Sequence, residues 1–172
     1  MRRLLALPFV FLSVLAAQQT ENDPWAPLQF LVGEWTGEGG GQPGQAAGRS
    51  SFEPGLEGQI LVRKSYAEYP AAKDRPAYRH DDLMIMHREP GGQPRAIYFD
   101  NEGHTIHYAV RPRDDGNAVE FVSDAAPDSP RFRLTYVKTG PATLSLKFEI
   151  APSGKPDAFS TYLQASLRRV SQ

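Results

Sequence analysis

Residues 131–150 read RFRLTYVKTGPATLSLKFEI, and this stretch decides the expected fold. In both halves, apolar side chains alternate with polar ones: Phe132, Leu134 and Tyr136, then Leu144, Leu146, Phe148 and Ile150. Successive side chains of a strand point to opposite faces of the sheet, so this alternation is typical of strands that bury one face. The stretch therefore predicts two consecutive β-strands that contribute to one core.

Segments of the same kind recur along the chain from Glu34 onward. Turn residues interrupt them at short intervals, which divides this region into candidate strands. We expect ten of them, at residues 35–41, 48–53, 59–69, 80–88, 95–100, 104–110, 119–123, 131–138, 143–150 and 160–169. Asn101-Glu102-Gly103 predicts a tight hairpin in which Gly103 supplies the positive φ.

The order of these segments favours an all-β fold. No long helical period lies between the candidate strands, so a parallel α/β sheet is not expected. One-sided strands can wrap a single core as a sandwich or as a barrel, and closing the sheet into a barrel removes its exposed edges. We therefore favour an antiparallel, up-and-down β-barrel of roughly ten strands.

One short helical segment precedes the strands. Asp23-Pro24-Trp25 is typical of a cap and first turn, because proline is tolerated where the backbone N–H has no helical partner. Leu28, Leu31 and Val32 recur at helical spacing, and Gly33 ends the segment. We expect a helix of one or two turns that plugs one end of the barrel.

The first 17 residues have the order of a secretory signal peptide. Arg2 and Arg3 precede an apolar run at residues 4–15, and the small residues Ala16 and Ala17 follow. The run is shorter than the ~20 residues that a membrane-spanning helix needs, which favours cleavage over anchoring. We therefore predict a signal peptide at 1–17, a short linker at 18–24 and a barrel domain at 25–172, in a periplasmic or secreted protein.

The composition excludes several kinds of partner and site. The formal net charge is −1 and no basic stripe is visible, so neither a nucleic acid nor, after cleavage, a membrane is an expected partner. The chain has no cysteine, which excludes disulfides, thiolate metal sites and lipid attachment behind the signal peptide. The expected partner is a small molecule, and the sequence leaves the oligomeric state open.

All four histidines lie between residues 80 and 107, where the strand pattern changes. Alternation places His80, Asp82, Met84 and Met86 on one face of the fourth strand, and both faces of that strand are partly apolar. If the fourth to sixth strands form a meander, their polar side chains converge on a small patch. The predicted ligand-binding residues are His80, Asp82, Tyr98, Asp100, His104 and Tyr162, the last from a resemblance given below.

Three functions are compatible with this cluster. The one we favour is a barrel that binds a small, mainly apolar ligand, with the cluster making the polar contacts. The second is an enzyme in which a histidine acts as general base and an aspartate orients it. The third is a structural envelope module whose core is filled by Met84, Met86, Phe132, Tyr136 and Phe148. A zinc ion is not expected, because His80, Asp82 and His104 make only three of the four ligands of a closed site.

Several segments resemble a known group of barrels. Residues 28–39, LQFLVGEWTGEG, resemble the opening of nitrobindin-like and related lipocalin-like (calycin-type) barrels, where a short helix leads into a Gly-x-Trp-x-Gly strand. Residues 162–169, YLQASLRR, are similar to the last strand of that group. Residues 80–84 and 98–104 resemble segments of uncharacterised exported bacterial proteins of the same barrel type. The resemblance covers residues 25–169 and implies about ten strands around an interior cavity.

The resemblance also bears on a cofactor. Nitrobindins hold haem through a histidine of the final strand, and Tyr162 occupies that place in this chain. We therefore expect no cofactor, and in particular no haem.

Overall fold

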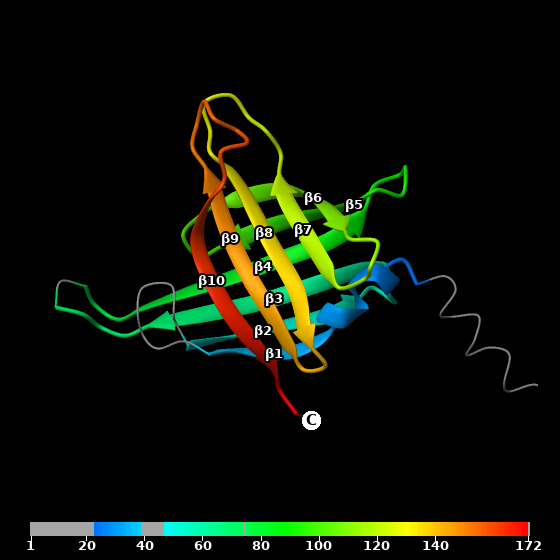
Figure 1. The fold of residues 1–172 in the computed structure, drawn as a ribbon, viewed down its shortest axis with the longest axis horizontal. Helices are drawn as coiled ribbons and strands as arrows, with labels where there is room; N and C mark the ends of the chain where they lie inside the picture. The colour runs from blue at the N-terminus through cyan, green and yellow to red at the C-terminus, as the bar shows by residue number, and fades with distance from the viewer. Residues whose placement is uncertain (1–22, 39–46, 74, 172) are drawn as a thin grey trace, which may run out of the picture.

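The computed structural model describes residues 23–38, 47–73 and 75–171, so the predicted signal peptide lies outside the described residues. A 3₁₀ helix, η1 (Ala26–Leu31), precedes ten strands. These are β1 (Gly33–Glu38), β2 (Ala47–Gly55), β3 (Ile60–Tyr69), β4 (Tyr78–Arg88), β5 (Pro94–Asp100), β6 (Thr105–Pro112), β7 (Ala118–Ser123), β8 (Arg131–Gly140), β9 (Thr143–Ala151) and β10 (Ser160–Arg169). Each strand pairs antiparallel with its neighbours in sequence, and β1 also pairs with β10, which closes the sheet into a barrel (Figure 1).

The expected ten-stranded antiparallel barrel is confirmed. Each predicted strand overlaps an observed one, and the ends that can be compared differ by at most two residues. Residues 39–41, the predicted end of the first strand, lie outside the described residues. The sequence predicts that the second strand ends before Pro54-Gly55, but both residues lie within β2, which pairs with β3 as far as Gly55. Gly103 has a φ of 91°, as the predicted hairpin requires.

The interior of the barrel is filled unevenly along its axis. Near η1, the inward-facing side chains are buried; we call this part the plugged half, and it includes Trp35, Phe52, Leu61, Met84, Met86, Val119, Phe121, Tyr136 and Leu144. At the opposite end, which we call the mouth half, inward-facing side chains are only partly buried: Ser65, His80, Tyr98, Ile106, Phe132, Leu146, Phe148 and Leu163. The mouth half is therefore the part of the interior that a ligand could enter.

Helix η1 closes the plugged half through two leucines and a tryptophan. Leu28 and Leu31 are buried in the core, and Trp25, just before the helix, is buried with them. The Trp25 indole N–H donates to the Gly58 carbonyl at 3.0 Å, which ties this segment to the β2–β3 turn. Within the described ranges, no helix is long and apolar enough to cross a membrane.

Arg169, at the end of the last strand, holds η1 against the barrel. Its guanidinium donates to the Phe30 and Val32 carbonyls at 3.1 and 2.6 Å and lies 4.2 Å from the centre of the Trp35 ring. Gly33 passes close beneath it, with a φ of 119°, and a Cβ at this position would lie 2.5 Å from Arg169 Nη1. The Gly-x-Trp segment thus serves the closure of the barrel, because glycine leaves space for the arginine that stacks on the tryptophan.

We predict that Arg169→Ala destabilises the protein by about 2–3 kcal/mol, because it removes two charge-assisted hydrogen bonds and a cation–π contact. Urea denaturation of the two proteins gives this difference. Arg113→Ala is the matched control, because Arg113 is exposed and its ion pair with Asp115 is long, at 3.7 Å. This substitution should change the free energy of unfolding by less than about 0.5 kcal/mol. Equal effects of the two substitutions would show that Arg169 does not hold η1.

Candidate functional site

Strands β4 and β5 direct a row of polar side chains into the mouth half. In the register of the two strands, Asp82 lies opposite Asp100 and Met84 lies opposite Tyr98. Met84 is buried in the core, so its alternating neighbours His80 and Asp82 share its inward face. The predicted meander of the fourth to sixth strands is therefore present, and it brings His80, Asp82, Tyr98 and Asp100 together.

A buried ion pair forms the deep end of this polar row. Arg63 on β3 donates from Nη2 to Asp82 Oδ2 at 3.1 Å and lies 3.0 Å from Asp82 Oδ1, and only 7% and 5% of the two side chains are exposed. Burial raises the pKa of Asp82, and the nearby Arg63 charge opposes that rise. Removing two charges from water costs several kcal/mol per ion, so each partner depends on the other to remain charged here.

Three tyrosine side chains face the buried guanidinium. Tyr98, Tyr108 and Tyr136 come from β5, β6 and β8, and their phenols are close enough to Arg63 to interact with its charge. Burial raises the pKa of each phenol, to about 12 for Tyr136, so all three hydroxyls keep their protons at neutral pH. The deep end of the site is thus rich in hydrogen-bond donors.

Several polar atoms at this deep end have no hydrogen-bond partner among the described residues. They are Arg63 Nε, Arg63 Nη1, the Tyr136 hydroxyl and Asp82 Oδ1, the last of which lies 3.0 Å from Arg63 Nη2 as an ion-pair contact, and all four are shielded from solvent. A buried polar group without a hydrogen bond costs about 1–3 kcal/mol. Natural proteins seldom keep such groups unless another molecule satisfies them.

His80 links the deep end to the rim of the mouth. Its Nδ1 lies 2.8 Å from Glu102 Oε1, and its Nε2 lies 3.0 Å from the Tyr98 hydroxyl and 3.7 Å from Asp82 Oδ2. The Tyr78 hydroxyl also donates to Glu102. These hydrogen bonds from Tyr78 and His80 lower the pKa of Glu102. Both ring nitrogens of His80 are engaged, so the imidazole is held in one orientation between Glu102 and Tyr98.

His104 joins the same network through Asp100. The Tyr98 hydroxyl donates to Asp100 Oδ2 at 3.2 Å, and His104 Nδ1 lies 2.8 Å from that oxygen. Asp100 Oδ1 accepts the backbone N–H groups of Glu102 and His104 at 3.0 and 2.9 Å. Burial alone would raise the pKa of Asp100, but these hydrogen bonds outweigh it and the pKa falls below its usual value.

An apolar wall faces this polar wall across the barrel. In the closed order of ten strands, β9 lies five places from β4 in either direction. The Phe132 and Phe148 rings of β8 and β9 stack with centroids 5.9 Å apart, and Leu146 and Leu163 extend the wall. The mouth half is therefore amphipathic, with hydrogen-bonding groups on β4–β5 and partly exposed apolar side chains on β8–β10.

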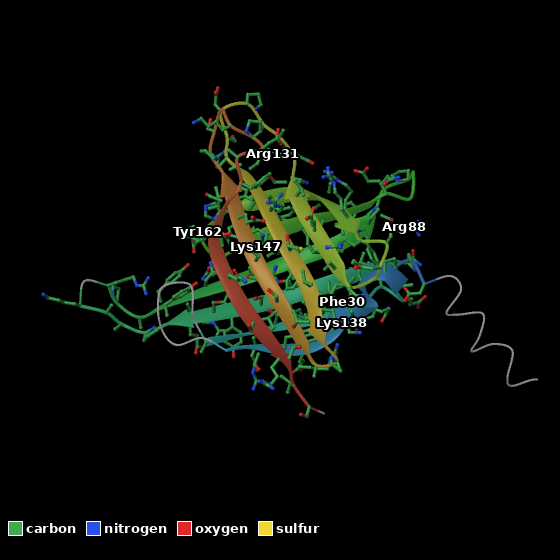
Figure 2. The ribbon with its side chains drawn as sticks, viewed as in Figure 1. Phe30, Arg88, Arg131, Lys138, Lys147 and Tyr162 are labelled. Carbon is green, nitrogen blue, oxygen red and sulfur yellow. The ribbon has the colours of Figure 1, made fainter. Side chains whose placement is uncertain are left out.

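Tyr162 stands apart from the other predicted site residues. It lies at a register shift between Thr161 and Leu163 of β10, where β9 offers it no register partner. Its side chain is 72% exposed and packs against the edge of the Phe148 ring, with centroids 6.1 Å apart. Figure 2 labels Tyr162 on β10. No hydrogen bond in the described part of the chain joins Tyr162 to His80, Tyr98 or Asp100, so this tyrosine lies against Phe148 of the apolar wall rather than in their network.

Sequence reasoning missed Arg63, which is the deepest polar residue of the site. The sequence did contain a signal for it. Leu61, Arg63 and Ser65 occupy every second position of the strand, so Arg63 shares the face of Leu61, which is a core residue. A charged residue on the apolar side of a strand marks a buried ion pair or a site. Lys64 lies on the other face, so both faces of the strand carry a cation, and the sequence does not distinguish the buried face by its charge.

A concavity lies on the outer face of the sheet. It is a shallow groove of about 560 Å³ over β1–β5, lined mainly by outward-facing side chains that include Arg49, Lys64, Tyr66, Leu83 and Phe99. Asp82 and Asp100 also border this groove, but the hydrogen bonds that join them to Arg63, Tyr98 and His104 run between side chains of the inward network, so we place the candidate site inside the barrel.

Comparison with models of known protein families gives no match, and comparison with curated proteins gives none either. The closed ten-stranded barrel is consistent with a calycin or lipocalin-like fold, and this likeness rests on the architecture alone. In the part of the chain that the structure describes, no three acid or histidine side chains are arranged to hold a metal ion.

The Arg63–Asp82 pair gives a stability prediction. Asp82→Ala should cost about 3–5 kcal/mol, because it leaves the buried Arg63 charge uncompensated. The double variant Arg63→Met/Asp82→Leu should be within about 1 kcal/mol of the parent, since it replaces the pair by apolar side chains of similar size. Chemical denaturation measures both values. A double variant as unstable as Asp82→Ala would mean that the pair itself stabilises the barrel.

The lowered pKa of Asp100 gives a pH prediction. Its ionised form is stabilised in the fold, so it adds stability above the unfolded-state pKa near 4 and loses that contribution as the pH falls through its lower folded-state pKa. Asp100→Asn should therefore destabilise the protein by about 1–2 kcal/mol at pH 7 and by much less at pH 2.5. Urea denaturation of both proteins across this pH range tests whether their free energies of unfolding converge at low pH. A difference that stays the same from pH 7 to pH 2.5 would contradict the prediction.

Proposed function

We propose that the protein is an exported barrel that binds a small, mainly apolar ligand in its mouth half. The observation that carries this proposal is the uneven filling of the interior, which leaves inward-facing Phe132, Phe148 and Leu163 partly exposed opposite a polar wall. Binding sites for small molecules are mostly apolar cavities with a few polar groups that fix orientation. The two walls of the mouth half match that description.

The energetics of such a site are adequate for specific binding. If a ligand covers about 150 Å² of apolar wall, the gain is about 4 kcal/mol. Two or three hydrogen bonds to the polar wall add about 1 kcal/mol each. Together with burial of the ligand's own apolar surface, this supports affinity in the micromolar range, which corresponds to about 8 kcal/mol.

The two alternatives fit the geometry less well. A structural module with a filled core would bury Phe132 and Phe148 as fully as it buries Met84, Met86 and Tyr136, and these two rings stay partly exposed. An enzyme using His80 as general base would have to act through the Tyr98 hydroxyl, which lies 3.0 Å from Nε2, or displace it, and binding requires neither step. Binding therefore accounts for more of the site than catalysis does.

The proposal also includes export and the lack of haem. Export to the periplasm or out of the cell is proposed because residues 1–17 follow the order of a signal peptide, basic, apolar and then small. The proposal that haem is not held through the last strand is supported by Tyr162, whose side chain is exposed at the bulge rather than directed at the network.

The test uses N-phenyl-1-naphthylamine, a neutral apolar dye whose fluorescence rises in an apolar environment. We predict that it binds the mature protein and that Phe148→Ala weakens binding at least tenfold, because that change removes part of the apolar wall. Gln164→Ala is the control, since Gln164 is exposed on the outer face of β10, and it should leave the affinity within twofold. No dye binding, or equal loss in both variants, would reject the site.

A further inference from the structure

The outward faces of β3, β4 and β5 carry apolar side chains that the proposed ligand site does not use. Val62, Ile85 and Ile97 lie in one cross-strand row, and Leu83 and Phe99 lie in the next. The Phe99 side chain is 39% exposed, and the other four are half-buried. The outward face of a barrel strand is normally polar where it meets water. These five side chains, which we call the outer patch, therefore indicate a contact surface.

The outer face of β8–β10 differs from the outer patch. Its outward positions carry mainly polar side chains: Arg133, Thr135, Ser145, Lys147, Glu149, Gln164, Ser166 and Arg168. Arg133 and Lys147 both form ion pairs with Glu149, at 2.8 and 3.2 Å. Around the outer patch, by contrast, the side chains of Glu53, Lys64 and His107 have no hydrogen bond or ion pair among the described residues.

The strand register arranges the patch and its charged neighbours symmetrically about β4. From β2 to β6, one row consists of Glu53, Val62, Ile85, Ile97 and His107. The next row consists of Ser51, Lys64, Leu83, Phe99 and Thr105. Both rows are apolar at β4 and polar at β2 and β6, and the first row has an acid at one end and an imidazole at the other. Such a pattern is complementary to its own mirror order.

We propose that the outer patch is the contact surface of a homodimer whose two-fold axis runs along β4. In this arrangement, β4 lies against β4 of the second copy, and β3 lies against β5 of the second copy. Val62 then packs on Ile97 of the second copy, and the Lys64 ammonium lies over its Phe99 ring. The Glu53 carboxylate accepts a hydrogen bond from its His107 imidazole. Each of these contacts occurs twice, because a two-fold interface uses the same surface on both copies.

A second copy fits this surface better than a small molecule does. The groove of about 560 Å³ over β1–β5 includes Leu83 and Phe99 but not Val62, Ile85 or Ile97. A ligand in that groove would leave half of the apolar patch in water. The opposite groups at β2 and β6, at equal distances from β4, are what a two-fold axis along β4 requires.

The size of the patch predicts a weak and reversible dimer. Five strands about 4.8 Å apart and about four rows of outward side chains cover on the order of 500 Å² on each copy. Two copies would together bury about 1,000 Å², which is near the lower limit for a specific interface. The dimer should therefore be populated at high protein concentration and dissociate on dilution.

The first test is sedimentation equilibrium of protein expressed from the full chain, over about a hundredfold range of concentration. The weight-average mass should rise from that of a monomer toward twice that value. Glu53→Lys and His107→Glu should each weaken association about fivefold or more, because each removes two contacts. The double variant Glu53→Lys/His107→Glu should restore it to within about twofold, since the two charges exchange sides. Lys155→Glu, a charge reversal in the β9–β10 loop, is the control and should leave association unchanged.

The second test locates the axis. The chain has no cysteine, so Leu83→Cys introduces a single thiol that faces its own copy across the two-fold axis. Sheets that pack face to face lie about 10 Å apart, and a short bismaleimide joins thiols at that separation. Leu83→Cys should give at least about tenfold more cross-linked dimer than Ser166→Cys, which is exposed on the outer face of β10.

This inference does not depend on the proposed ligand site, because none of these substitutions lies in the mouth half. A monomer at every concentration would overturn it, and so would equal cross-linking of the two cysteine variants. Association that the single charge reversals do not weaken, or that the double reversal does not restore, would overturn it as well. Binding of N-phenyl-1-naphthylamine should stay within twofold in all of these variants, and its failure in the parent protein would bear on the proposed function alone.

Discussion

The buried pair of Arg63 and Asp82 is the constraint on which the rest of the interior depends. Both side chains are almost fully shielded, and the guanidinium contacts one carboxylate and faces three phenols. A charge in this position requires its counter-charge, and the remaining donors require acceptors. The interior is therefore not packed with apolar side chains throughout, and the pair lies between an apolar plugged half and a polar, partly exposed mouth half.

The two halves are stabilised in different ways. The plugged half is closed by apolar packing around Trp35 and by Arg169, whose hydrogen bonds hold η1 across the end of the barrel. The mouth half is held by a network that passes from Asp82 through His80 and Tyr98 to Asp100. Rigid closure at one end allows polar side chains to be arranged at the other, because the strand register is already set by the full length of the sheet.

The architecture was predictable from sequence because the signals are local. Alternation in residues 131–150 and the spacing of turn residues each depend on a few neighbouring positions, and together they predict all ten strands. Arg63 and Tyr162 were not predictable in the same way. The role of Arg63 depends on Asp82 of the next strand, and the exposure of Tyr162 accompanies a register shift between β10 and β9.

The histidines also show how far local sequence signals reach and where the positions of strands and faces decide. All four lie between residues 80 and 107, and their closeness in sequence indicates one patch. His80 and His104 do join one network, whereas His87 and His107 lie on the outer face, as alternation requires. In an up-and-down meander, residues of one sequence region occupy neighbouring strands, so a polar wall can be encoded in about 25 residues.

The apolar wall lies five strands away around the ring, and it therefore comes from a separate part of the chain, around Phe132 and Phe148. This topology allows the two walls to change independently. Substitutions on β8–β10 would alter the apolar wall and leave the polar wall of β3–β5 unchanged, and the reverse holds for substitutions on β3–β5.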